Sequence, residues 1–151
     1  MASTLPADTL LPFETKAKLT NYAIERHSLD FPEMDVQHDY LYMLFDRIEN
    51  SSKVTDKTAT KKLLLEIEHY LLFHFASEEH LMRMYNFPTF TVHRSDHEQA
   101  GERFSIFIDD FEAEKLNPSN LKDFLFGWLT EHARTGDSEY VSWIKEYRSA
   151  L

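Results

Sequence analysis

Six polar side chains occupy helix positions where the sequence pattern calls for apolar residues, and all six are of types that bind metal ions. They recur on the apolar faces of four separate segments: His38, His74, Glu78, His93, His97 and His132. Burying such groups without partners is unfavourable, so we expect them to be satisfied together. A single histidine on an apolar face is more often a hydrogen-bonded core residue, and the prediction therefore depends on the whole set. Imidazole and carboxylate ligands without thiolate suit iron, zinc, copper or nickel.

The spacing within the segments directs these side chains to one place. His74 and Glu78 are four residues apart, as are His93 and His97, and side chains at that spacing share one face of a helix. The set lies alternately near the starts and the ends of successive segments. In an up-down-up-down bundle those positions meet at the same end, where metal sites are built from inward-facing side chains.

Asp137 is a seventh candidate, but a regular helix would direct it elsewhere. Asp137 lies five positions after His132, and at the helical period that step turns its side chain about 140° away from the histidine. Read alone, Asp137 is a surface or C-terminal residue. We predict that the helix is irregular at 133–137, as a π-bulge or a loosened last turn, because Gly136 permits an unusual backbone there.

Four amphipathic segments must position these side chains. Apolar residues recur at steps of three and four over 34–50, 57–85, 89–116 and 118–135, and a shorter segment covers 138–148. Asn117 is a plausible N-cap, with Pro118 at the first helical position. The sequence predicts an all-α fold, an antiparallel up-down-up-down four-helix bundle over 33–151. An irregular N-terminal arm over 1–32 precedes it, and a short C-terminal helix ends it.

Composition excludes several other classes of protein. The chain has 151 residues, enough for one domain with a real core, and its lack of cysteine removes disulfides, thiolate metal sites and iron–sulfur clusters. A formal net charge of -10 disfavours nucleic acid and anionic membranes as partners. Neither a secretory signal nor a membrane-spanning apolar run is found, so we expect no membrane insertion and a cytoplasmic location.

The ordered set of motifs resembles the hemerythrin family in its short bacterial form. The resemblance covers about 33–147, and each motif alone is weak, whereas all four in order on four helices are highly specific. The matching pieces are Asp35-Val-Gln-His38, His74-Phe-Ala-Ser-Glu78-Glu-His-Leu-Met82, His93-Arg-Ser-Asp-His97 and Trp128-Leu-Thr-Glu-His132-Ala-Arg-Thr-Gly-Asp137.

This resemblance implies two iron ions with an oxo or hydroxo bridge, in a non-haem centre that binds dioxygen reversibly. By motif position, the expected ligands of the first iron are His93, His97 and His132, those of the second are His38 and His74, and the two bridging carboxylates are Glu78 and Asp137. The second iron would keep one open position for dioxygen. The expected role is storage, transport or delivery of oxygen rather than catalysis. A domain that senses oxygen or redox state for a protein partner in trans, and a peroxidase or nitric-oxide-handling enzyme, remain alternatives.

The sequence departs from the family beside the expected oxygen pocket, which Trp128, Leu129 and Ala133 would line. Members usually carry a large aliphatic residue after the last histidine, where this chain has Ala133, and the residue before the bridging aspartate is Gly136. Both changes would widen the pocket or admit water, unless a neighbouring phenylalanine fills the space. The family's usual N-terminal tryptophan is also missing, with Phe13 and Phe31 as candidates to replace it.

Three further histidines are expected to lie outside the site. Glu66 and His69 form a Glu-x-x-His pair of the kind found in carboxylate-rich di-iron proteins, but they flank the apolar stripe rather than occupy it. His27 and His80 also lie off the stripe. We expect all of them to be solvated.

Overall fold

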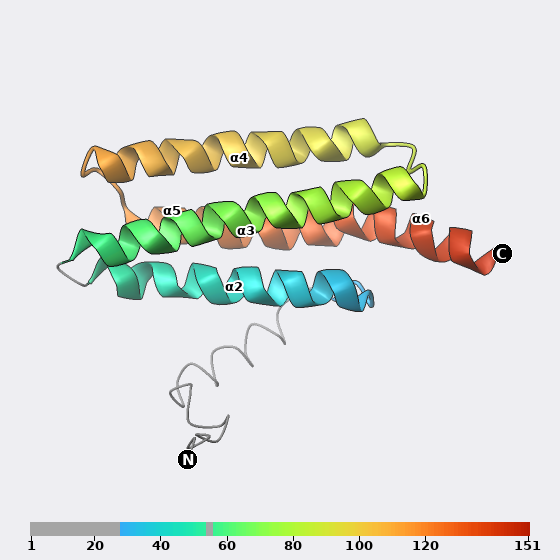
Figure 1. Ribbon diagram of the computed structural model, residues 1–151, viewed down its shortest axis with the longest axis horizontal. Coiled ribbons are helices and arrows are strands. Elements are labelled where there is room, and N and C mark those ends of the chain that lie inside the picture. Colours follow the sequence, from blue (N-terminus) through green and yellow to red (C-terminus); the bar gives the residue numbers. More distant parts are fainter. Residues whose placement is uncertain (1–27, 54–55) are drawn as a thin grey trace, which may run out of the picture.

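The structure, a computed structural model, describes residues 28–53 and 56–151, and the described chain is helical without any strand. Its elements are α2 (Pro32–Ser52), α3 (Lys57–Met84), α4 (Phe90–Glu112), α5 (Pro118–His132), a π-helix, η2 (Ala133–Asp137), and α6 (Ser138–Ser149) (Figure 1). The expected all-α fold is confirmed.

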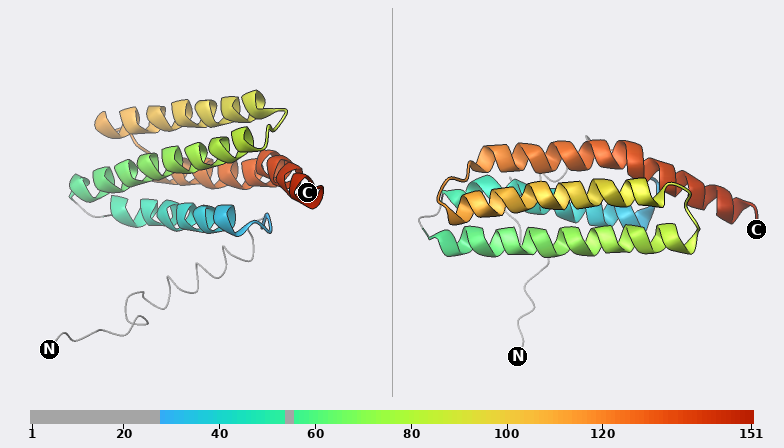
Figure 2. Two further views of the ribbon diagram at one scale, coloured as in Figure 1. Left: turned by 45° about the vertical axis from the view of Figure 1, so that its right-hand side comes forward. Right: turned by 90° about the horizontal axis from the view of Figure 1, so that it is seen from above.

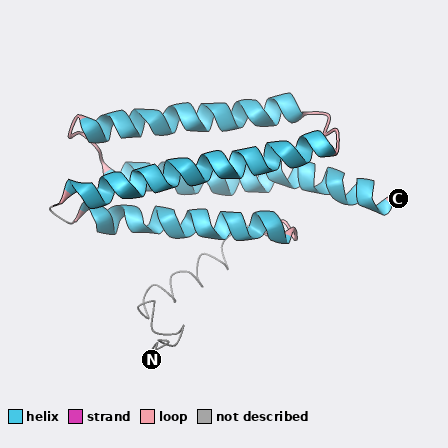
Figure 3. Ribbon diagram, in the orientation of Figure 1, coloured by secondary structure: helices cyan, strands magenta, loops and turns pink. Residues whose placement is uncertain are grey.

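Successive helices run in opposite directions and are joined by short connections, which gives an antiparallel bundle (Figures 1 and 3). Helix α2 packs against α3 and α5, and α4 packs against the same two helices from the other side. The C-terminal segment continues the direction of α5 and extends past the ends of the other helices (Figure 2). It is not a separate element after a break, because the backbone stays helical from α5 through η2 into α6.

Local sequence signals explain where two of the helices begin. The Asn117 side chain accepts a hydrogen bond from the backbone N–H of Asn120 and precedes Pro118, as predicted for the start of α5. Asp56 caps α3 by accepting from the N–H of Thr58. Helix α4 ends four residues before the predicted boundary, because Glu114 adopts a left-handed conformation with φ of 59°.

The interior contains two apolar clusters rather than one continuous core. The larger, called the long cluster, contains buried residues along all four bundle helices, from Leu41 on α2 to Leu129 on α5. The smaller, called the end cluster, joins Met34, Met82, Phe87 and Tyr140 at the other side of the predicted site residues. The site residues lie between these two clusters along every helix, so the polar layer is shielded from both directions.

The residues before α2 help to close the end cluster. Leu29 and Phe31 are buried in it, and the Asp35 carboxylate accepts hydrogen bonds from the N–H groups of both. Phe31 therefore occupies an apolar position ahead of α2, whereas Phe13 and most of the expected arm over 1–32 lie outside the described residues. Within the part of the chain that the structure describes, no helix is long and apolar enough to span a bilayer.

We predict that truncating the long cluster destabilises the bundle strongly. Phe45 is fully buried, and its ring contacts those of Tyr42 and Phe126. Phe45→Ala should lower the free energy of unfolding of the metal-free protein by about 3–5 kcal/mol, because it leaves a cavity. Phe73→Ala is the matched control, since that side chain is 55% exposed. Equal midpoints for the two variants in urea unfolding would contradict this description of the core.

Candidate metal centre

The structure brings all seven predicted site residues into one buried layer. None is more than 5% exposed, and Glu78, His74 and Asp137 are fully buried. Their donor atoms form two overlapping groups, within each of which all the atoms lie within 4.8 Å of one another. The three-histidine group contains His93, His97 and His132, the two-histidine group contains His38 and His74, and both groups include Glu78 and Asp137.

In the three-histidine group, the Nε2 atoms of all three rings converge. His132 Nε2 lies 3.1 Å from His97 Nε2 and 3.1 Å from His93 Nε2. Nitrogen lone pairs this close repel one another unless a proton or a cation lies between them. The convergence therefore fits a metal ion bound by three imidazoles.

The two-histidine group contains buried polar atoms that have no hydrogen-bond partner among the described residues. The rings of His38 and His74 meet edge to face, with centroids 4.8 Å apart. Among the described residues, the buried side-chain atoms without a hydrogen-bond partner are His38 Nε2, His74 Nε2 and both carboxylate oxygens of Asp137. Unpaired buried polar atoms are unfavourable, and cations bound within this layer would satisfy these atoms.

Glu78 presents one carboxylate oxygen to each group. Its Oε2 lies 3.0 Å from His97 Nε2 and 3.3 Å from His93 Nε2. Its Oε1 lies 3.3 Å from His74 Nε2 and accepts a hydrogen bond of 3.1 Å from the Tyr140 hydroxyl.

Asp137 divides its oxygens in the same way. Its Oδ1 lies 3.0 Å from His132 Nε2 and 3.2 Å from His93 Nε2, whereas its Oδ2 lies 3.2 Å from His38 Nε2. A carboxylate with one oxygen on each side can bridge two cations, and this layer contains two such carboxylates.

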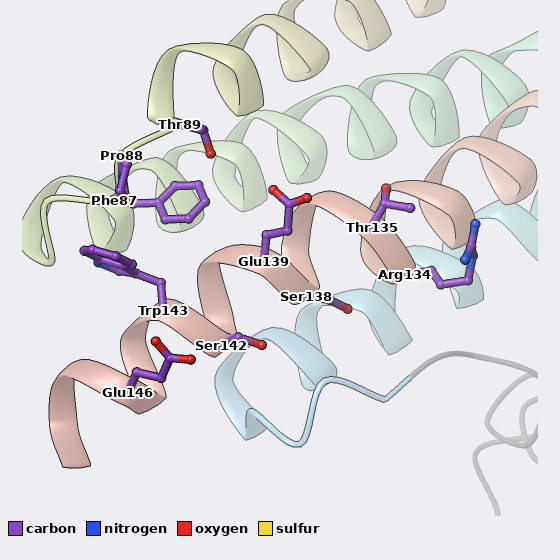
Figure 4. A pocket seen from close by; sticks show the side chains of 10 residues that line it. All are labelled: Phe87, Pro88, Thr89, Arg134, Thr135, Ser138, Glu139, Ser142, Trp143 and Glu146. Carbon is purple, nitrogen blue, oxygen red and sulfur yellow. The ribbon is translucent and has the colours of Figure 1, made fainter. Parts of the chain in front are cut away.

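The predicted irregularity at 133–137 is confirmed, because the chain forms a π-helix over Ala133–Asp137. The extra residue in a π-turn reduces the rotation between His132 and Asp137 and brings both side chains to the same face. The outer face of this turn carries Arg134 and Thr135, which line a surface pocket of about 670 Å³ between α6 and the α3–α4 connection (Figure 4). None of the seven site residues lines that pocket.

Gly136 does not widen a pocket, contrary to the expectation from sequence. A Cβ atom at this position would lie 3.2 Å from His93 Nδ1 and 3.3 Å from His132 Cε1. The two imidazole rings already fill the space that a side chain would take. A side chain at this position would fit only if the His93 and His132 rings shifted by a few tenths of an ångström.

The three predicted pocket residues lie close to the three-histidine group. The Trp128 ring stacks on the His132 ring, with centroids 4.6 Å apart and planes 14° apart. Leu129 is fully buried and Ala133 is 3% exposed. Their role in admitting oxygen stays a prediction.

Sequence reasoning missed a second layer of side chains that hold the site residues in place. Gln37 Oε1 lies 2.8 Å from His74 Nδ1, and Glu79 Oε1 lies 3.0 Å from His97 Nδ1. Phe75 stacks on the His97 ring, with centroids 4.1 Å apart and planes 9° apart. Tyr140 lies about one turn after Asp137 and is fully buried. Gln37 and Glu79 each adjoin a site residue in the sequence, which was the available signal.

The remaining predicted exclusions agree with the structure where it describes them. Glu66, His69 and His80 are exposed, and Glu66 accepts a hydrogen bond from the Tyr40 hydroxyl. His27 lies outside the described residues.

The buried charges shift the pKa values of the site residues in the metal-free protein. Burial lowers the pKa of His38 and His93, but the close, negatively charged carboxylates of Asp137 and Glu78 outweigh it and raise the pKa of each to about 9. Burial dominates at His74 and lowers its pKa to about 4. Burial raises the pKa of both carboxyls, yet the surrounding imidazoles hold them well below their usual range. Two imidazolium groups thus offset two carboxylates when metal is absent.

Comparisons with known proteins give the same family as the motifs. The family model described as the hemerythrin HHE cation binding domain matches residues 30–144. A bacteriohemerythrin of Pseudomonas aeruginosa strain LESB58 is 28% identical over 118 residues, which are 78% of this chain and 77% of the relative. A bacteriohemerythrin of Aquifex aeolicus strain VF5 is 29% identical over 109 residues, covering 70% and 82%. No solved structure matches the chain.

We predict that Gly136→Ala weakens metal binding by about 10-fold, which is the lower end of the range for changes to residues around metal ligands. The added Cβ of the alanine would push the His93 and His132 rings away. Competition with a chelating dye for Zn²⁺ measures this loss. Gly127→Ala is the matched control, since nothing lies within 4 Å of its added Cβ. The control should bind Zn²⁺ as wild type does and unfold with about 0.5–1 kcal/mol more stability. Equal Zn²⁺ affinities in the two variants would contradict the close approach.

We also predict that metal binding tightens as pH rises from neutrality toward 9. A ligand nitrogen must be unprotonated, and His38 and His93, with pKa values of about 9, keep their protons at pH 7 in the metal-free protein. Loading at pH 7 should therefore release about two protons, and the release should vanish well above pH 9. Calorimetry in buffers of different ionisation enthalpy counts the protons. An affinity for Zn²⁺ that is level between pH 7 and 9 would contradict the assignment.

Proposed function

The chain belongs to the hemerythrin HHE cation-binding family, and from this membership we propose that it holds two iron ions and binds dioxygen reversibly. The observation that supports two ions rather than one is the division of both buried carboxylates between the two histidine groups. A single ion would leave one group of buried nitrogens without a partner.

In this proposal the three-histidine group holds one iron and the two-histidine group holds the other. Glu78 and Asp137 each bridge the pair, and an oxo or hydroxo group completes the bridge. Three imidazoles and two carboxylate oxygens would hold the first iron, whereas two imidazoles and two carboxylate oxygens would hold the second. The second iron therefore keeps a position for dioxygen.

Two ferrous ions would supply the two electrons that reversible dioxygen binding needs. The chain's own residues contribute in two ways: through the chemical types of the ligands and by excluding water from the site. Five neutral imidazoles stabilise oxidised iron less than a carboxylate-rich set would, which favours release of bound oxygen over oxidation of another molecule. The long cluster and the end cluster keep bulk water from the layer.

Tyr140, in the end cluster, donates a hydrogen bond to one of the two carboxylates proposed to bridge the ions. Burial, followed by the negative charges of Glu78 and Asp137, raises its pKa well above the ordinary range for a phenol. The hydroxyl therefore keeps its proton and donates to Glu78 Oε1 at 3.1 Å. This contact fixes the orientation of the carboxylate proposed to bridge the ions.

The proposal predicts a coloured adduct that reverses. The metal-free protein is loaded anaerobically with ferrous iron, exposed to oxygen, and followed by its visible charge-transfer absorption while the iron content is measured. We expect two iron ions per chain, and absorption that appears with oxygen and fades on degassing through several cycles.

Two results would contradict the proposal in different ways. Binding of fewer than two iron ions per chain would remove the di-iron centre. Immediate and irreversible conversion to the diferric form would retain the centre but replace oxygen carriage by sensing or by peroxidase or nitric-oxide chemistry.

A further inference from the structure

The two metal positions have different second-layer partners, one charged and one neutral. On the three-histidine side, His97 Nδ1 lies 3.0 Å from the Glu79 carboxylate. On the two-histidine side, His74 Nδ1 lies 2.8 Å from the Gln37 amide oxygen. Both rings turn Nε2 into the site, so a metal ligand at either position carries its proton on Nδ1 and donates it to these partners.

We propose that Glu79 and Gln37 are positioning residues that widen the difference in affinity between the two metal positions beyond the difference of one imidazole, so that the three-histidine position binds the first ion and holds it more tightly. This inference rests on the proposed two-metal centre and goes beyond it. Neither side chain would touch a metal ion, since each would act through the imidazole that it accepts from.

The physical basis is the difference between a carboxylate and an amide as a hydrogen-bond acceptor. A hydrogen bond to an ionised acceptor is roughly twice as strong as one between neutral groups. It draws the Nδ1 proton toward the carboxylate, increases the electron density at Nε2 and strengthens the bond from Nε2 to a cation. An amide oxygen gives the same orientation with much less of this effect.

The surroundings of the two pairs strengthen the contrast. The Glu79 side chain is only 24% exposed, so water screens its charge incompletely. Phe75 stacks flat on the His97 ring and restricts the rotation that would break the contact with Glu79. The His74 side chain is fully buried, and its Nε2 has no hydrogen-bond partner among the described residues. Gln37 orients that ring without adding a charge.

The contrast between Glu79 and Gln37 also bears on the proposed oxygen site. The more strongly donating position would favour the oxidised ion, whereas the position next to Gln37 would hold its ion more loosely. That looser position is the one proposed to keep an open site for dioxygen. The second-layer pair would thus separate an ion that anchors the centre from an ion that exchanges ligands.

The test exchanges the two acceptors and uses Zn²⁺ alone as the probe, so that neither iron nor oxygen is needed. Zn²⁺ is titrated at fixed pH into the metal-free full chain, with affinities from a competing chelator. The hydrogen-bonded Nδ1–H resonances of His97 and His74 report which position fills. In wild type, the His97 signal should shift with the first equivalent and the His74 signal with the second.

Glu79→Gln should weaken the three-histidine position by about 10–100-fold, the usual effect of removing such a partner. Gln37→Glu should tighten the two-histidine position by a similar factor, and a gain cannot arise from damage to the fold. The double variant should narrow the difference in affinity between the two positions by more than either single variant does. Glu66→Gln and Gln99→Glu make the same changes at exposed positions and should leave both steps unchanged.

Loss of affinity in Gln37→Glu, or an unchanged difference in affinity between the two positions in the double variant, would overturn the inference while leaving the two-metal centre intact. Failure of the wild-type chain to bind a second Zn²⁺ would overturn both the inference and the proposed function. Circular dichroism of each variant at the helical bands checks that the bundle is formed.

Discussion

Two carboxylates and five imidazoles are buried in one layer, and the free-energy cost of burying them is the constraint on which the rest of the structure depends. All seven side chains are nearly or fully buried, between an apolar cluster that follows the bundle and another that closes its end. Without metal, imidazolium groups at His38 and His93 offset the charges of Glu78 and Asp137. Metal ions would replace those protons and satisfy the unpaired atoms at the same time. Other features of the fold bring these seven side chains close to one another.

The π-helix is the clearest of these features. A regular helix cannot direct His132 and Asp137 to one point, whereas the π-turn at Ala133–Asp137 does so without interrupting the path from α5 to α6. On its inner side, a Cβ at Gly136 would make tight contacts with the rings of His93 and His132 and displace them slightly. Tyr140 then follows on the same face and donates to Glu78. This one irregular turn thereby positions the Asp137 carboxylate, lets the rings of His93 and His132 pack against it, and is followed by Tyr140 on the same face.

Sequence alone predicted the parts of the site that depend on helical periodicity. His74 with Glu78, and His93 with His97, follow from a four-residue step, and the irregular turn followed from the misfit of Asp137. Glu79, Gln37 and Phe75 were not predicted, because each lies beside the stripe and its contact depends on how neighbouring helices are rotated and spaced. Gly136 was misinterpreted because a missing side chain resembles free space until the neighbouring rings are known. The early end of helix α4 was not predicted because the left-handed residue that follows it is Glu114, and neither a glycine nor a proline marks that position.

Diffraction from crystals of the iron-loaded chain, with anomalous data collected at the iron absorption edge, tests the central claim most directly. In the proposed centre, this layer holds two ions bridged by two carboxylates. We predict two anomalous peaks, one within bonding distance of His93, His97 and His132 and the other within bonding distance of His38 and His74, with Glu78 and Asp137 in contact with both. A single peak, or two peaks of which only one touches both carboxylates, would contradict the account.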